Sequence, residues 1–243
     1  MNRFVLLLFL MSSKLLLAQA DREITYGFFA GANYSSLSNL PDVIVPNGIY
    51  EGYNLTEKAK FGGTGGLLIN WKYPYAKFSL QTEISYSGQS TDLNYDDIKG
   101  LEYKIHFGFN YLNIGGQFKY YPMEGFYIGA GPYVGLNLTS DNISYSSNSQ
   151  ELFANSGAYF EPDATVEKVL KESLTGKNHF YLMFSVGYEF SSNLSIGARY
   201  ALGLTDALAT EENGHRFSEN KNISNSLSLI IGYSFDFDDL TNF

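Results

Sequence analysis

Residues 111–138, YLNIGGQFKYYPMEGFYIGAGPYVGLNL, decide the fold because they contain two alternating runs joined by a short turn. Apolar side chains occupy every second position of each run, and polar or glycine residues occupy the positions between them. Successive side chains of a strand point to opposite faces, so each run has one apolar and one polar face. Pro122 and Gly125 lie between the runs and favour a chain reversal. The stretch therefore predicts an amphipathic β-hairpin.

The same alternation recurs along the chain and predicts eight strands of about ten residues each. We place them at residues 24–34, 61–71, 78–88, 103–120, 126–138, 180–190, 194–204 and 227–237. Their connections are in turn long (35–60, 89–102, 139–177 and 205–222) and short (72–77, 121–125 and 191–193). Antiparallel strands joined in this way place every long loop at one end, as in outer-membrane barrels. The prediction is an all-β fold, an eight-stranded antiparallel transmembrane β-barrel with four long extracellular loops and short periplasmic turns.

The distribution of aromatic residues separates this barrel from a secreted lipocalin-like barrel, which is apolar inside and polar outside. Here the consistently apolar face carries aromatic residues at the ends of runs, where a girdle would meet the membrane interface. The candidate girdle residues are Trp71, Phe78, Tyr120, Phe126, Phe190 and Phe237. The opposite face carries Gly, Ser, Asn, Gln and isolated charges, which cannot form the core of a soluble barrel. We therefore predict the membrane barrel and not the soluble one.

The N-terminus and the composition suggest an exported protein. Arg3, the apolar run at residues 4–11 and the Ala18-Gln19-Ala20 site predict a signal peptide over residues 1–20, with a mature start near Asp21. The alternative, a membrane anchor, would need an apolar run of about 20 residues. The chain contains no cysteine, which excludes disulfides, thiolate metal sites and a lipid-modified cysteine. A formal net charge of -9 argues against nucleic acid as a partner.

Charged and amide side chains on the inward face predict a polar network inside the barrel. An eight-stranded barrel is just wide enough for its inward side chains to fill it, and a buried charge needs a partner. The inward candidates are Gln81, Glu83, Gln117, Lys119, Glu189 and Arg199. We expect Arg199 to pair with Glu83 or Glu189 and the network to plug the barrel. A narrow pore lined by the same residues is the alternative.

Two further patterns concern the loop end of the barrel. Apolar residues change parity between Tyr111 and Leu112, which indicates either a β-bulge or a hairpin that projects beyond the apolar layer. Residues 164–174 show apolar positions at helical spacing behind Pro162. We expect a short helix that packs over the long loop; a partner-binding helix is the alternative.

We expect no enzyme, no catalytic residue, no cofactor and no metal site. The histidines are His106, His179 and His215, and a pairing of His106 with Ser85 or Ser87 is the one nucleophile and base combination that stays open. The acidic residues of the second loop and of the C-terminus match no calcium-binding spacing, so we expect solvated acidic surface. Residues 62–66, rich in glycine, lie within a strand and do not precede a helix as a phosphate loop would.

The central hairpin resembles the PorT-like family of small outer-membrane β-barrels. The residues that carry the resemblance are YLNI at 111–114, KYY at 119–121 and GFYIGAGPYVG at 125–135; the family's Leu-Glu-Ile-Pro run is Leu-Asn-Ile-Gly here, at 112–115. The resemblance implies a bacterial outer-membrane location and a non-enzymatic accessory or structural role in a secretion or assembly complex. Its partners would be outer-membrane lipid and other outer-membrane or periplasmic proteins. The alternatives are a surface protein that binds an external ligand through its loops and a small diffusion channel.

Overall fold

The computed structural model describes residues 23–44, 52–72, 76–157, 160–211, 217 and 220–236. The predicted signal peptide at 1–20, the mature start at Asp21 and the girdle residue Phe237 lie outside the described residues, as does His215.

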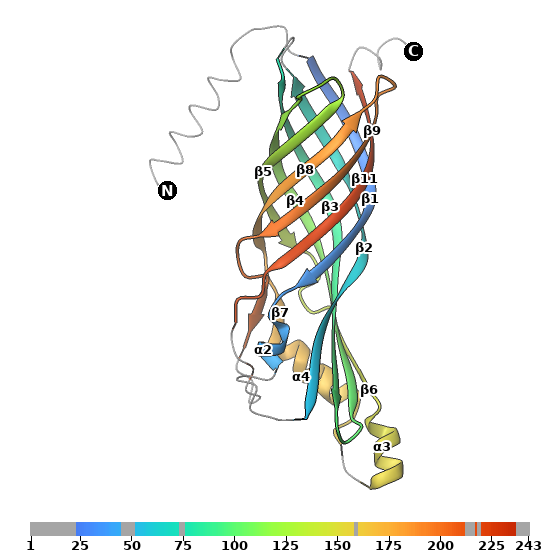
Figure 1. The fold of residues 1–243 in the computed structure, drawn as a ribbon. Coiled ribbons are helices and arrows are strands. Elements are labelled where there is room, and N and C mark those ends of the chain that lie inside the picture. The colour runs from blue at the N-terminus through green and yellow to red at the C-terminus, as the bar shows by residue number, and fades with distance from the viewer. Residues whose placement is uncertain are drawn as a thin grey trace, which may run out of the picture.

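Eight strands form a closed antiparallel ring (Figure 1), which confirms the predicted barrel. They are β1 (Glu23–Leu37), β2 (Tyr53–Lys72), β3 (Phe78–Asp97), β4 (Glu102–Tyr120), β5 (Phe126–Asn137), β8 (His179–Glu189), β9 (Leu194–Gly203) and β11 (Ser224–Asp236). Each strand pairs with the next strand of the ring, and β1 pairs with β11 to close it. The short connections lie at one end of the barrel, here called the turn end, and the long ones at the other, the loop end.

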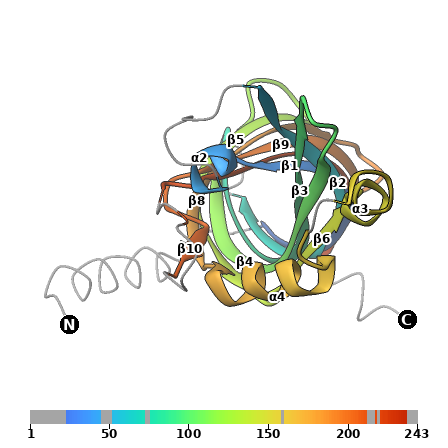
Figure 2. The same cartoon turned by 90° about the horizontal axis from the view of Figure 1, so that it is seen from below.

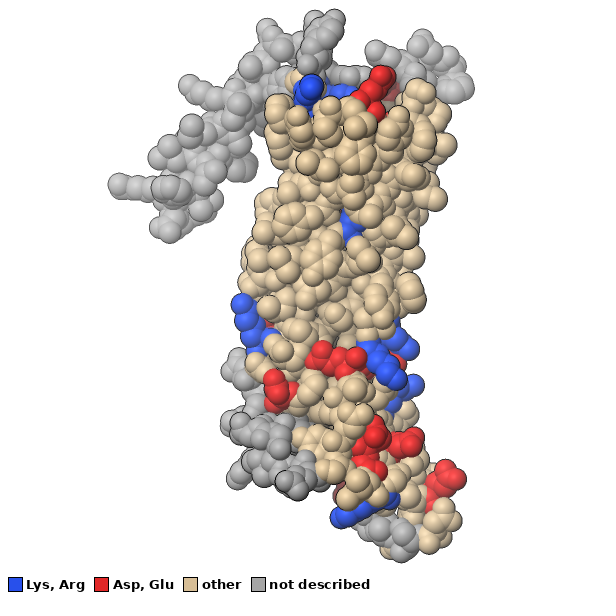
Figure 3. Space-filling model, in the orientation of Figure 1, with Lys and Arg blue, Asp and Glu red and all other residues tan. Residues whose placement is uncertain are grey.

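The barrel is inverted relative to a soluble protein, with polar side chains inside and apolar ones outside. Inward residues of the ring that are almost fully buried include Asn33, Ser85, Asn113, Gln117 and Ser228. Outward residues such as Phe28, Leu67, Phe118, Leu229 and Ile231 are largely exposed. Figure 3 shows the resulting band of barrel surface, almost free of charge, with charged residues at the turn-end rim and again toward the loop end. Such a band is the surface that lipid covers.

Two of the predicted loops are wrong in large part because strands run through them. The loop predicted at 89–102 is mostly strand, because β3 continues to Asp97 and β4 begins at Glu102. The loop predicted at 35–60 is shorter at both ends, because β1 runs to Leu37 and β2 begins at Tyr53. The β3–β4 register is continuous from Phe78↔Tyr120 to Asp96↔Glu102. Beyond the lipid an outward side chain has no reason to be apolar, so these polar residues still form strand.

The other two predicted loops also contain regular elements. Residues 139–177 form β6 (Ile143–Ser147), α3 (Ser149–Ser156), α4 (Asp163–Ser173) and β7 (Leu174–Gly176), and residues 205–222 contain β10 (Leu208–Thr210). The helix predicted at 164–174 is confirmed as α4. A further short helix, α2 (Leu40–Ile44), follows β1. In the described part of the chain, every helix is too short or too polar to cross a membrane.

The parity change in β4 is not a bulge. Its register against β3 is unbroken, so Tyr111 and Asn113 both point inward. Outward side chains of β4 are apolar from Leu112 toward the turn end and polar from Asn110 toward the loop end. Inward side chains are polar or small toward the turn end and apolar toward the loop end. The reversal marks the place where the strand leaves the lipid. The one-residue register shift lies instead between β2 and β3, from Ala59 to Thr64.

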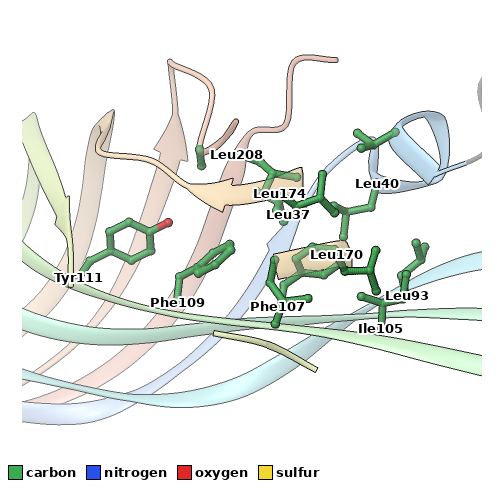
Figure 4. Packing of buried hydrophobic residues seen from close by; sticks show 13 residues of the cluster. Leu37, Leu40, Leu93, Ile105, Phe107, Phe109, Tyr111, Leu170, Leu174 and Leu208 are labelled. Atoms are coloured by element: carbon green, nitrogen blue, oxygen red, sulfur yellow. The ribbon is translucent and has the colours of Figure 1, made fainter. Parts of the chain in front are cut away.

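A hydrophobic core fills the loop end, beyond the lipid. Strands β2, β3 and β4 continue past the ring and form, together with β6, a four-stranded sheet, here called the extension. Its inward face meets α2, α4, β7 and β10, which lie beside the end of the ring (Figure 2). The side chains of the core point toward one another in Figure 4. They include Leu37, Leu40, Val43, Leu93, Ile105, Phe107, Phe109, Tyr111, Ile143, Leu170, Leu174 and Leu208.

Candidate functional site

A buried ion pair crosses the barrel interior. Arg199 Nη1 of β9 lies 2.9 Å from Glu83 Oε1 of β3, and each residue is only 5% exposed. Gln81 Nε2 donates to the other carboxylate oxygen of Glu83 at 3.0 Å. The guanidinium carbon of Arg199 lies 4.2 Å from the centre of the Phe29 ring. Of the two partners expected for Arg199, the structure brings Glu83 to it.

The expected pairing of Arg199 with Glu189 is absent because Glu189 has another partner. Lys119 Nζ lies 2.9 Å from Glu189 Oε1. Tyr121 Oη donates to the same carboxylate, at 3.1 Å from either oxygen. Glu189 is the last residue of β8 and lies at the turn end. Arg199 lies nearer the middle of the barrel, opposite Ser185 of β8. Two separate ion pairs therefore cross the interior.

Inward side chains leave little free space around these pairs. Gln117 Oε1 accepts a hydrogen bond from Ser185 Oγ. Gly115 has no side chain, and a Cβ there would clash with the ring of Tyr133, its direct neighbour on β5. A cavity lined by Glu83, Arg199 and several Ser residues has a volume of about 20 Å³, enough for about one water molecule. This filling supports the expected plug over the expected pore.

Those aromatic residues of the predicted girdle that the structure describes lie near the turn end. Phe78 and Phe190 are over two-fifths exposed, and the Phe78 ring stacks on those of Phe118 and Tyr120. Trp71 of β2 and Phe126 of β5 are half-buried. The girdle at the loop end was missed: Tyr34 and Phe61 have ring centres 4.9 Å apart, and Tyr86 Oη donates to Asn110 Oδ1. Tyr34 ends one predicted run and Phe61 begins the next, so an aromatic residue at the end of a run was a signal for this girdle as well.

A polar cluster joins three strands on the outer surface, just beyond the loop-end girdle. Asp92 of β3 lies directly opposite His106 of β4, with 2.6 Å between Oδ1 and Nδ1. Lys60 Nζ of β2 lies 2.9 Å from Asp92 Oδ2. Ser85 and Ser87 point into the barrel, away from His106, so the candidate Ser-His pairing is wrong. On β3 and β4 the even-numbered residues, such as His106, face outward, and the odd-numbered residues, such as Ser85 and Ser87, face inward.

Asp92 is expected to make the stability of the protein acid-sensitive. Burial opposes its ionisation, but hydrogen bonds from His106 and Lys60 outweigh burial and hold the pKa of this carboxyl below its ordinary value. A group with a depressed folded pKa stabilises the protein above its unfolded pKa, and that contribution is lost as the pH falls through the folded value. Stability should therefore drop as the pH falls below about 4, and Asp92→Asn should flatten this drop. Urea titrations from pH 3 to pH 7 measure the free energy of unfolding of wild type and of Asp92→Asn. Identical pH profiles for the two proteins would contradict a depressed pKa for Asp92.

The extension carries an aromatic stack that the sequence analysis missed. Tyr53, Tyr95, Tyr103 and Tyr145 stand on four neighbouring strands, with ring centres 5.7, 4.4 and 5.5 Å apart in that order. Helix α4 protects the free edge of β6, because Glu167 and Asp163 accept hydrogen bonds from the backbone N–H groups of Tyr145 and Ser147. The tyrosine stack and the capped edge of β6 make the extension rigid.

Two grooves lie on the outer surface. One, of about 590 Å³, lies on the extension; the other, of about 680 Å³, lies on the barrel wall within the charge-free band. The extension groove carries many polar groups and is lined by Asn94, Tyr95, Asp96, Glu102, Tyr103, Lys104, Ser146, Ser147 and Asn148. The wall groove is apolar, and small side chains on β1 and β9 (Ala30, Ala32 and Ala198) form its floor.

A protein-family model matches most of the chain. The family described as "Outer membrane protein beta-barrel domain" matches residues 17–209, well over half of the chain. No curated protein sequence matches significantly.

Several solved structures are similar in fold. Neisserial surface protein A is 10% identical, with a TM-score of 0.41 and coverage of 86% of this chain and 97% of that one. OprG of Pseudomonas aeruginosa is 15% identical, with a TM-score of 0.42 and coverage of 90% and 97%. Ail, the attachment invasion locus protein of Yersinia pestis, is 11% identical, with a TM-score of 0.37 and coverage of 88% and 99%.

Proposed function

Since the chain belongs to the outer membrane protein β-barrel domain family, we propose that it is a non-enzymatic surface protein whose extension binds a partner outside the cell. The observation that carries the proposal is the extension itself. An anchor in the membrane needs strands only as long as the lipid is thick. Here β2 and β3 have 20 residues each, about twice that requirement, and the part beyond the lipid has its own core.

The geometry of the extension suits recognition. Its tyrosine stack and core hold the polar groove in one shape, so little conformational entropy would be lost when a ligand binds there. The groove offers amide, carboxylate, hydroxyl and ammonium groups, which favour a polar ligand such as a saccharide or a peptide. The filled interior of the barrel speaks against a diffusion channel.

A second candidate role is that of an accessory subunit in an outer-membrane secretion or assembly complex, as the PorT-like resemblance implies. The wall groove favours it, because small residues allow close approach of an apolar partner within the membrane. A subunit contact would then lie on β1, β8, β9 and β11, on the barrel wall, and not on the extension.

Site-specific photo-crosslinking in the native outer membrane separates the two roles. A benzophenone amino acid replaces Ser146 in the extension groove, Ala32 in the wall groove or, as a control, lipid-facing Leu80 on β3. We expect protein or glycan adducts from position 146 and only lipid adducts from positions 32 and 80. A defined protein adduct at 32 with none at 146 would favour the accessory role and contradict the surface role.

A further inference from the structure

Lysine residues follow the loop-end girdle on the outer face of β2. Phe61, 79% exposed, belongs to the girdle, and Lys60 comes directly before it at the register shift. Lys58 lies two residues, about 7 Å, beyond Lys60 along the strand. A lysine side chain can reach back toward the membrane while its charge stays in water. Both ammonium groups therefore lie at the depth of the polar headgroup layer.

The cross-strand register gives Lys60 a fixed position. Asp92 accepts from Lys60 on one side and pairs with His106 on the other, and its own side chain is only 7% exposed. The carboxylate thus holds Lys60 against the sheet and is itself covered. About half of the Lys60 side chain remains accessible to a ligand.

Lys58 is exposed and lies directly opposite Asp92 in the β2–β3 pairing. It has no hydrogen bond or ion pair to any other residue that the structure describes. Its positive charge is therefore available for a ligand.

The described part of the neighbouring strands carries charges of both signs near this patch. Lys104 lies two positions beyond His106 toward the loop end, and Asp141 is an exposed acid next to Asn142, whose backbone carbonyl accepts a hydrogen bond from the N–H of Gly108. The patch is basic although the whole chain has a formal net charge of -9, so it does not simply reflect composition. Charge complementarity points to an anionic ligand, and continuity with the lipid-covered band points to one that lies in the membrane.

We propose that Lys58 and Lys60 bind the phosphate of an anionic lipid headgroup in the outer leaflet. Asp92 and His106 are positioning residues that hold Lys60 in place. Charge-assisted N–H···O contacts to phosphate are among the stronger hydrogen bonds, and the adjacent girdle would contact the acyl chains of the same lipid. The contact is independent of whichever partner the extension groove takes.

Binding of bis-phosphorylated lipid A to the purified full-length barrel in detergent, followed by native mass spectrometry, tests this site. The variants are Lys58→Gln, Lys58→Gln/Lys60→Gln and a control with the same charge change, Lys99→Gln/Lys168→Gln, whose lysines lie far from the membrane on the β3–β4 turn and on α4. We expect at least about tenfold weaker binding for the first double variant and binding within about twofold of wild type for the control. Lys58→Gln disturbs no described contact, so it reports on binding even if the double variant folds poorly.

Two further ligands complete the experiment. Chemically dephosphorylated lipid A should bind wild type and the first double variant equally weakly. Inorganic phosphate alone should not bind below the millimolar range. The assignment is overturned if both double variants lose affinity equally, if removal of the phosphates has no effect, or if inorganic phosphate binds as tightly as the lipid.

Discussion

Arg199→Met is expected to destabilise the barrel by about 3–5 kcal/mol, because it leaves Glu83 buried without a countercharge. Methionine keeps much of the side-chain volume against Phe29, so loss of packing contributes little. The free energy of unfolding can be measured by urea titration in phospholipid vesicles. Trp71, the single tryptophan, provides the fluorescence signal.

The matched control is the double variant Glu83→Gln/Arg199→Met, which removes both charges. Since no ion remains buried, we expect it to recover a large part of the lost stability. Equal losses in the single and double variants would show that the cost comes from packing. An unchanged free energy in the single variant would contradict a stabilising role for the pair.

Phe107→Ala is expected to loosen the hydrophobic core at the loop end. Phe107 is 1% exposed among the side chains of β1, α4 and β7, and truncation of a buried phenylalanine typically costs about 3–5 kcal/mol. Hydrogen exchange measures the effect locally, at the backbone amides of α4. A loss of this size lowers their protection by about a hundredfold or more, because each 1.4 kcal/mol is a factor of ten.

Phe153→Ala is the control for this change. Phe153 lies on α3, is 53% exposed and does not belong to the core, so its replacement should shift stability by no more than about 0.5 kcal/mol. If the two variants lower protection in α4 equally, the core does not stabilise the extension.

Alternation was sufficient to predict the barrel, because lipid favours apolar side chains at the outward positions of a spanning strand. It failed for β2 and β3 beyond the membrane, where outward residues such as Asp92 and Asn94 are polar and resemble a loop. The missed signal was Leu93 and Tyr95, apolar residues on the opposite parity. Strand prediction for such barrels should therefore accept a reversal of polarity within one strand.

The polar interior could be predicted as a set of residues but not as pairs. Glu83 and Arg199 come from strands that are not neighbours in the ring, so their contact depends on the stagger of all strands between them. The Asp92–His106 pair is different, because one hairpin register determines it. A prediction that counted back from the turn at residues 98–101 would have found it.

The strands of the extension continue from the membrane without interruption, and this has a mechanical consequence. A force applied to a ligand in the extension groove is carried by β3 and β4 directly into the barrel, with no hinge between them. The height of the groove above the membrane is then set by strand length alone. Removing two residues from each strand would lower it by about 7 Å along the strands and keep its faces, whereas removing one would turn the groove residues inward.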